Sequence, residues 1–210
     1  MKKIITLFIA IFAVMVIVGC ASKPKLKTEI LEEKGTRWGV ERPKWVETIL
    51  STPNQKTLSK ALGIDKHIWV LSSEGEDLEF LQNYVDQVSA RAEIAASIEQ
   101  IIADSALAGF KGGGEDANEK SLNRDSARGA MVNLVGLNKE IDWWTKTRSR
   151  LDRKSDYEIK YNYLVVYSLE EDLYQKQIRE AINNSGIKET SIEMIFEKLN
   201  DLAVIKVQPK

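Results

Sequence analysis

The sequence predicts an α+β protein in which a long helix and further helices pack on one face of a small antiparallel β-sheet. Apolar residues recur every three or four positions from Leu78 to Ile102, a spacing typical of one long amphipathic helix. Residues 157–168 instead alternate with a period of two, which is typical of a strand with one buried face. The two periodicities occupy separate blocks of the chain, and this separation favours the α+β class.

The remaining elements follow from shorter patterns of apolar, glycine and turn residues. A β-branched and aromatic run between Gly63 and Gly75 predicts the first strand. A turn at 151–156 separates the two later strands and predicts an antiparallel hairpin. The predicted order is a strand at 66–73, helices at about 76–107 and 119–135, strands at 138–150 and 157–168, and helices at 170–184 and 189–201. The last residues, 204–210, are expected to form a short edge strand or a frayed end.

Residues 1–19 are expected to act in export and not to belong to the fold. Lys2 and Lys3 precede the apolar run Ile4–Val18, which has 15 residues and is interrupted only by Thr6. A membrane-spanning helix needs about 20 apolar residues, so this run suits the apolar region of a signal peptide. The alternative is an uncleaved N-terminal membrane anchor.

The segment Ile17-Val18-Gly19-Cys20 resembles the lipobox of bacterial lipoproteins. That resemblance implies attachment of diacylglycerol to the Cys20 thiol, cleavage before Cys20, and acylation of the new amino group by a fatty acid such as palmitate. Cys20 is the only cysteine in the chain, so an intrachain disulfide is excluded. Residues 20–42 are then expected to form a flexible tether, and residues 43–210 a single domain. The absence of Asp directly after Cys20 resembles lipoproteins sorted to the outer membrane, on its periplasmic or surface side.

Composition argues against several classes of function. The chain has 30 basic and 31 acidic residues, and losing Lys2 and Lys3 with the signal peptide leaves 28 basic residues and a net charge of about −3. This balance argues against a nucleic-acid partner. One histidine, His67, and one cysteine cannot supply a catalytic triad or a zinc site, and His67 is expected to be a surface or partly packed residue. The glycine-rich run 111–114 follows a helix and precedes Glu115, so it predicts a loop and not a phosphate cradle. We therefore expect no cofactor, no metal and no enzymatic activity.

A basic strand supplies the one candidate interaction surface. In an extended strand Trp144, Lys146, Arg148 and Arg150 share one face, and Trp143 lies on the other. Trp143 is therefore expected in the core, with Trp144 and the three cations facing outward. The simpler interpretation is a solvated sheet face. The alternative is a contact surface for an anionic glycan, a lipid phosphate or an acidic patch on an envelope protein.

The order of these motifs resembles the LPP20-like family of bacterial lipoproteins. The resemblance rests on Pro43-Lys44-Trp45-Val46, the helix segment Ala90–Ala95, Trp143-Trp144 and the Tyr-rich strand at 161–167, and it spans about residues 43–170. It implies a helix packed on a small antiparallel sheet, an outer-membrane or surface location, no enzymatic activity, and in some relatives an association with the flagellum.

Three hypotheses for function follow. The first is a non-catalytic envelope lipoprotein, anchored to the membrane through Cys20, that presents a binding or assembly surface. The second is a structural accessory of an envelope apparatus such as the flagellum or a secretion system. An enzyme acting on envelope polymers ranks last, because no spacing in the sequence identifies the paired carboxylates that glycosidases use.

Overall fold

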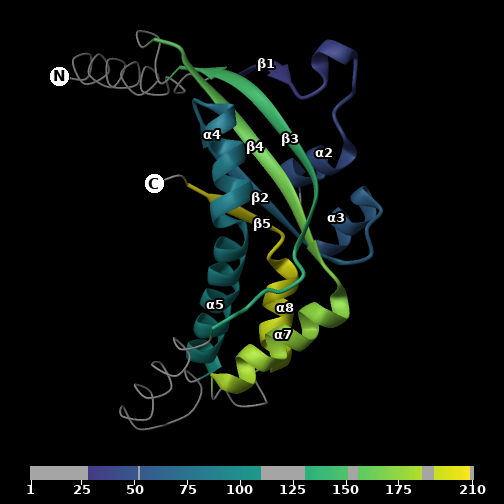
Figure 1. Ribbon diagram of the computed structural model, residues 1–210, viewed down its shortest axis with the longest axis vertical. Helices are drawn as coiled ribbons and strands as arrows, with labels where there is room; N and C mark the ends of the chain where they lie inside the picture. Colours follow the sequence, from purple (N-terminus) through teal and green to yellow (C-terminus); the bar gives the residue numbers. More distant parts are fainter. Residues whose placement is uncertain (1–27, 52, 110–130, 151–155, 186–191, 209–210) are drawn as a thin grey trace, which may run out of the picture.

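The computed structural model describes residues 28–51, 53–109, 131–150, 156–185 and 192–208. These residues form an α+β fold around one five-stranded sheet with the strand order β1-β3-β4-β2-β5. Long strands β3 (Asn138–Ser149) and β4 (Glu158–Leu169) form an antiparallel hairpin that starts at one end of the molecule and leads toward α7 and α8 (Figure 1). Strand β2 (His67–Gly75) pairs antiparallel with β4. The predicted class and these three strands are confirmed.

Two edge strands change the predicted sheet. Strand β1 (Glu29–Glu33) pairs antiparallel with β3 and forms one edge. Strand β5 (Val204–Val207) pairs parallel with β2 at the other edge, so the sheet is mixed and the prediction of a purely antiparallel sheet is wrong. The tether predicted to extend from Cys20 to Arg42 is also too long, because β1 lies within it. At the C-terminus, the edge strand is the correct one of the two alternatives for residues 204–207.

A nearly continuous helical rod covers one face of the sheet. It consists of α4 (Leu78–Asn83), a π-helical segment (Tyr84–Ser89) and α5 (Ala90–Gly109). Asp77 caps its start, because the carboxylate accepts a hydrogen bond of 3.0 Å from the backbone N–H of Phe80. Together these helical segments confirm the helix predicted at 76–107. Of the helix predicted at 119–135, residues 119–130 lie outside the described residues, and residues 131–135 are not helical.

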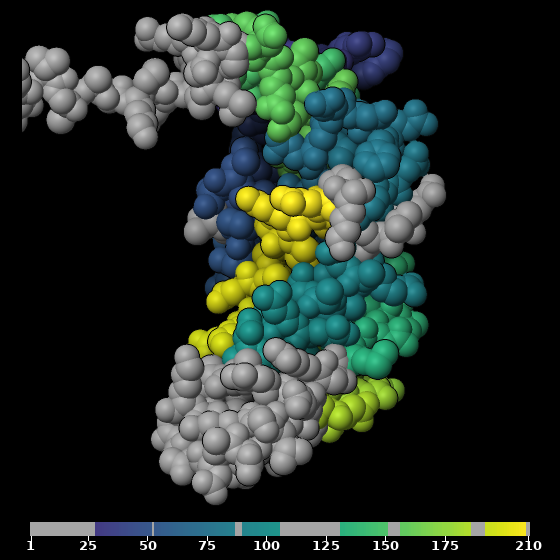
Figure 2. All heavy atoms as spheres, turned by 90° about the vertical axis from the view of Figure 1, so that its left-hand side faces the viewer, coloured from purple at the N-terminus to yellow at the C-terminus, as the bar shows by residue number. Residues whose placement is uncertain are grey.

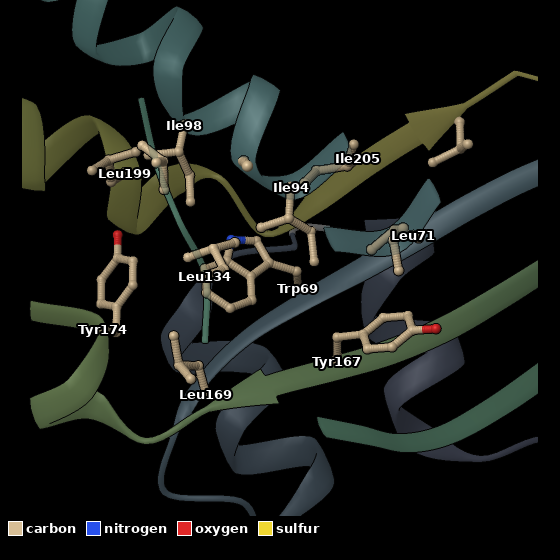
Figure 3. Close-up of a cluster of buried hydrophobic side chains, with 14 of the residues drawn as sticks. Trp69, Leu71, Ile94, Ile98, Leu134, Tyr167, Leu169, Tyr174, Leu199 and Ile205 are labelled. Carbon is tan, nitrogen blue, oxygen red and sulfur yellow. The ribbon is translucent and has the colours of Figure 1, made fainter. Parts of the chain in front are cut away.

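The main core lies between the sheet and this rod. Trp69 and Tyr167 of the sheet pack beneath Ile94 and Ile98 of α5, and all four side chains are buried (Figure 3). Helices α7 (Glu171–Asn184) and α8 (Ile192–Asp201) complete the cluster from one end of the molecule (Figure 1). The two predicted C-terminal helices are confirmed.

The opposite face of the sheet is also covered. Short helices α2 (Lys44–Ser51) and α3 (Gln55–Leu62) pack Trp45, Val46 and Leu58 there against a second buried cluster. The sheet contributes Ile68, Val70, Trp143, Leu164, Val166 to this cluster. Helices therefore lie on both faces, and the prediction that they pack on one face is wrong. Strand β2 is correspondingly buried on both sides over residues 67–71.

Candidate functional site

The structure brings the four predicted surface residues together on one face of the β3–β4 hairpin. Lys146 of β3 pairs in register with Tyr161 of β4, and Arg148 pairs with Ile159. Trp144 and Arg150, two positions to either side, share this face by the alternation of the strand. We call the resulting set the hairpin surface; it comprises Trp144, Lys146, Arg148, Arg150, Tyr157, Ile159, Tyr161. Cys20, the predicted lipidation site, lies outside the described residues.

Cations of β3 lie over aromatic rings of β4 across this surface. The Lys146 ammonium is 5.2 Å from the centre of the Tyr161 ring. The guanidinium groups of Arg148 and Arg150 lie 4.6 Å and 4.3 Å from the Tyr157 ring centre. Such contacts hold the three cations in place over the rings. Sequence reasoning identified the cations but missed the tyrosines, although the alternation of β4 already places residues 157, 159 and 161 on one face.

Trp144 is less exposed than predicted. Its side chain is half-buried, packs against the main core cluster and meets Tyr161 edge-on with ring centres 5.9 Å apart. The prediction that Trp144 faces outward is therefore wrong to this extent. Trp144 lies on the face of the sheet that the helical rod covers farther along the strands. Trp143 is buried in the second cluster, which confirms its predicted place in a core.

Carboxylates balance the cations of the hairpin surface. Glu29 of β1 accepts a hydrogen bond of 2.6 Å from Arg148. Beside Lys146, Tyr157 and Tyr161 the chain forms a shallow hollow of about 560 Å³, and Glu76 and Asp156 also line it. The surface thus offers cations, carboxylates and aromatic rings side by side.

A second polar site, which sequence reasoning missed, lies around Asp86 in the π-helical segment. Its carboxylate accepts hydrogen bonds from the Lys139 ammonium (2.6 Å) and from the hydroxyls of Tyr163 and Tyr167 (both 3.3 Å). Lys139 is also 3.1 Å from Asp142, which in turn pairs with Lys34. The site therefore joins the helical rod to β3, β4 and the loop after β1.

The pKa values in this network fit a permanently charged ion-pair cluster. Partial burial acts to lower the pKa of Lys139, but hydrogen bonds to Asp86, Tyr163 and Asp142 outweigh it and raise that pKa. Burial also acts to raise the pKa of Asp142, and here the hydrogen bonds from Lys34 and Lys139 prevail and lower it. Burial raises the pKa of Tyr163, and it raises that of Tyr167 to about 12. None of these groups is prepared for proton transfer near neutral pH, so the network is best understood as a structural clamp.

Removing the Asp86 carboxylate is expected to loosen this clamp. Asp86→Ala should destabilise the fold by about 1–3 kcal/mol, because Lys139 loses one of its charged partners and two phenols lose their acceptor. Chemical denaturation of the variant measures this loss. Gln100→Ala, at an exposed position of the same rod, is the control and should change stability by less than about 0.5 kcal/mol. Equal stability of the two variants would show that the network contributes nothing.

The only histidine is buried, contrary to prediction. His67 at the start of β2 is 3% exposed, and its ring stacks on Tyr174 of α7 with centres 3.6 Å apart. Its Nδ1 atom lies 3.5 Å from the Glu171 carboxylate, and among the described residues its Nε2 atom has no hydrogen-bond partner. Burial lowers the pKa of His67 to about 3, so the ring is neutral at physiological pH. Such a histidine supports packing and not acid–base catalysis.

Within the described ranges no three His, Cys, Asp or Glu side chains are placed to hold a metal ion. None of the helices in the described part of the chain is both long and apolar enough to cross a membrane.

Comparison with protein-family models, with curated proteins and with solved structures gave no match to this chain. The resemblance to LPP20-like lipoproteins therefore stays a prediction from short motifs.

Proposed function

We propose that the protein is a non-catalytic lipoprotein of the bacterial cell envelope that is anchored through Cys20 and presents the hairpin surface to a ligand. The observation that carries this proposal is the position of Cys20. This residue, the only cysteine, directly follows a 15-residue apolar run and Gly19, and the first strand begins nine residues later. A lipid on Cys20 would hold the folded domain at a membrane by a short connection.

The hairpin surface supports the binding part of the proposal. Arg148 and Arg150 present guanidinium groups that are oriented by one tyrosine ring, and guanidinium groups bind phosphate and carboxylate well. The hollow beside them is open and shallow, unlike the enclosed clefts in which most enzymes hold small substrates. We place the domain on the outer membrane because Ala21, and not Asp, follows Cys20.

Acylation of Cys20 is the direct test. Bacteria grown with an alkyne-bearing palmitate analogue should incorporate it into the wild-type protein, and intact mass spectrometry should show a mature chain that begins at Cys20 and carries diacylglycerol. Cys20→Ala should abolish both signals, because the thioether cannot form. Ser22→Ala, two residues away, is the matched control and should retain both. An unmodified wild-type chain that still carries residues 1–19 would overturn the proposal.

A further inference from the structure

The hairpin surface lies at the end of the domain from which the chain leads back to Cys20. Strand β1 starts at Glu29, which pairs in register with Arg148 near the C-terminal end of β3. From Cys20 to Glu29 the chain can reach at most about 30 Å even when fully extended. Figures 1 and 2 show that the hairpin forms one end of the long axis of the molecule, and that α7 and α8 lie toward the other end. An anchor on Cys20 would therefore keep the hairpin end nearer the membrane than the α7 end.

The side chains at this end match the interface of a membrane. Tyr157 is 52% exposed and Ile159 is 44% exposed, although both lie on the face that elsewhere packs against the helical rod. Tyrosine and tryptophan rings together with Arg and Lys side chains are enriched where a protein meets lipid headgroups. Arg148 and Arg150 stack on the exposed Tyr157 ring, so their guanidinium groups lie on the same side of the domain as this ring.

An exposed tryptophan lies in the loop that follows β1. Trp38 is 86% exposed, the highest value among the described large apolar side chains. Gly35 and Gly39 flank its short helical turn with φ angles of 86° and 69°, a conformation that disfavours other residues. A Cβ on Gly35 would also lie 2.7 Å from the Cβ of Val40, so the turn is tightly built. This loop lies at the same end of the long axis as the hairpin (Figure 1).

The balance of charge narrows the class of lipid. Among the described residues, the surface carries the cations Lys146, Arg148 and Arg150 and the carboxylates Glu29, Glu76, Asp156 and Glu158, the last of which pairs with Lys160. This mixture of both charges, with no excess of cations, gives little attraction to a purely anionic surface. The mixture instead matches a headgroup that has a phosphate for the cations and an ammonium for the carboxylates.

We propose that the hairpin surface is a membrane-contact site that binds zwitterionic phospholipid headgroups of the phosphatidylethanolamine type. The inference rests on the proposed function, because the lipid on Cys20 sets which end of the domain faces the membrane. The contact would fix the orientation of the domain and direct α7 and α8 away from the bilayer.

Cysteine labelling of the acylated full-length protein tests this orientation. A thioether on Cys20 leaves no free thiol in the mature chain, so Ile159→Cys or Lys176→Cys can each be labelled selectively with a fluorophore. Lys176 is an exposed residue of α7 and is the matched position at the other end. The proteins are reconstituted in phosphatidylethanolamine–phosphatidylcholine vesicles that contain lipids spin-labelled near the headgroup. Quenching at position 159 should be several-fold greater than at position 176, whereas equal quenching would overturn the proposal.

Charge reversal and lipid exchange test the binding chemistry. Lys146→Glu combined with Arg150→Glu should at least halve the quenching at position 159, because the phosphate contacts are replaced by repulsion. Lys176→Glu combined with Arg179→Glu makes the same change of charge on α7 and should leave it unaltered. Quenching that rises when phosphatidylglycerol replaces phosphatidylethanolamine would overturn the zwitterionic assignment.

The parent protein distinguishes a failure of the anchoring proposal from a failure of the membrane-contact proposal. If the parent protein, without an introduced cysteine, takes up the fluorophore, then Cys20 is a free thiol and the anchoring proposal fails. If the parent does not react and carries lipid by mass, while position 159 is not quenched, only the membrane-contact inference fails.

Discussion

Lowering the pH from 7 to 5 is expected to reduce the stability of the fold by about 2 kcal/mol through His67 alone. The unfolded chain binds a proton at His67 below its ordinary pKa of about 6.5. The folded chain does not, because burial lowers the pKa there to about 3. Between these two pKa values the unfolded state holds more protons, so stability falls as the pH falls. Above pH 6.5 the neutral His67 ring makes its full contribution to the stability of the fold.

The surroundings of His67 explain why the neutral form is retained. Its ring packs against both Trp69 and Tyr174, with ring centres 4.6 Å and 3.6 Å away. The carboxylate of Glu171 approaches Nδ1 to 3.5 Å, but half of that side chain is exposed, and water weakens its attraction for an imidazolium. Desolvation therefore dominates. Lys66, the preceding residue, is already paired with Glu170 and Glu140.

The His67 prediction is measured by urea unfolding at pH 7, 6 and 5. His67→Phe keeps an aromatic ring against Tyr174 and removes the titrating group, so the variant should lose about 2 kcal/mol less than wild type over this range. Because His67 is the only histidine, no other side chain has an ordinary pKa near 6.5. Parallel pH profiles for the two proteins would refute the prediction. The chemical shifts of the His67 ring, followed by NMR, should not titrate above pH 5.

Truncation of Trp143 is expected to destabilise the fold far more than truncation of its neighbour Trp144. Trp143→Ala should cost about 3–5 kcal/mol, because the side chain is 4% exposed and packs in the second core cluster against α2 and α3. In a chain of this size that loss should lower the melting temperature by about 6–20 °C. Trp144→Ala should cost about 1–2 kcal/mol, because its side chain is half-buried and keeps contact with water.

Thermal and chemical denaturation of the two alanine variants check this difference directly. Trp143→Phe is the control for the position, because it keeps a ring in the cluster and should recover most of the loss. Equal losses for Trp143→Ala and Trp144→Ala would mean that α2 and α3 do not cover the second face of the sheet. The comparison therefore tests the arrangement of layers as well as two side chains.

The features that sequence patterns predicted well are those with long, regular periodicity. Residues 78–102 show a helical apolar stripe over many turns, and residues 157–168 show the alternation of a strand. Short elements were missed because eight or fewer residues carry too little periodicity. Helices α2 and α3 have eight residues each, and β1 has five. The apolar run Leu164-Val165-Val166 within β4 was a usable sign that both faces of the sheet are covered.

For the candidate site, the sequence identified residues but not their surroundings. The cations of β3 could be placed on one face by strand alternation alone. The pairing of Arg148 with Glu29 joins residues 119 positions apart, and no local pattern predicts such a contact. The network around Asp86 depends in the same way on three separate segments that the sheet and the helical rod bring together.

By itself, the sequence determined the fold class, the three long strands, the long helix and the single cysteine whose lipidation we propose. The tertiary structure decided which sheet faces are covered, that His67 is buried and neutral, and that the hairpin surface lies where the chain leads back to Cys20. The physical reason is that periodicity fixes which residues share a face of an element. Burial, pairing and charge depend on what packs against that face, and those partners come from distant parts of the chain.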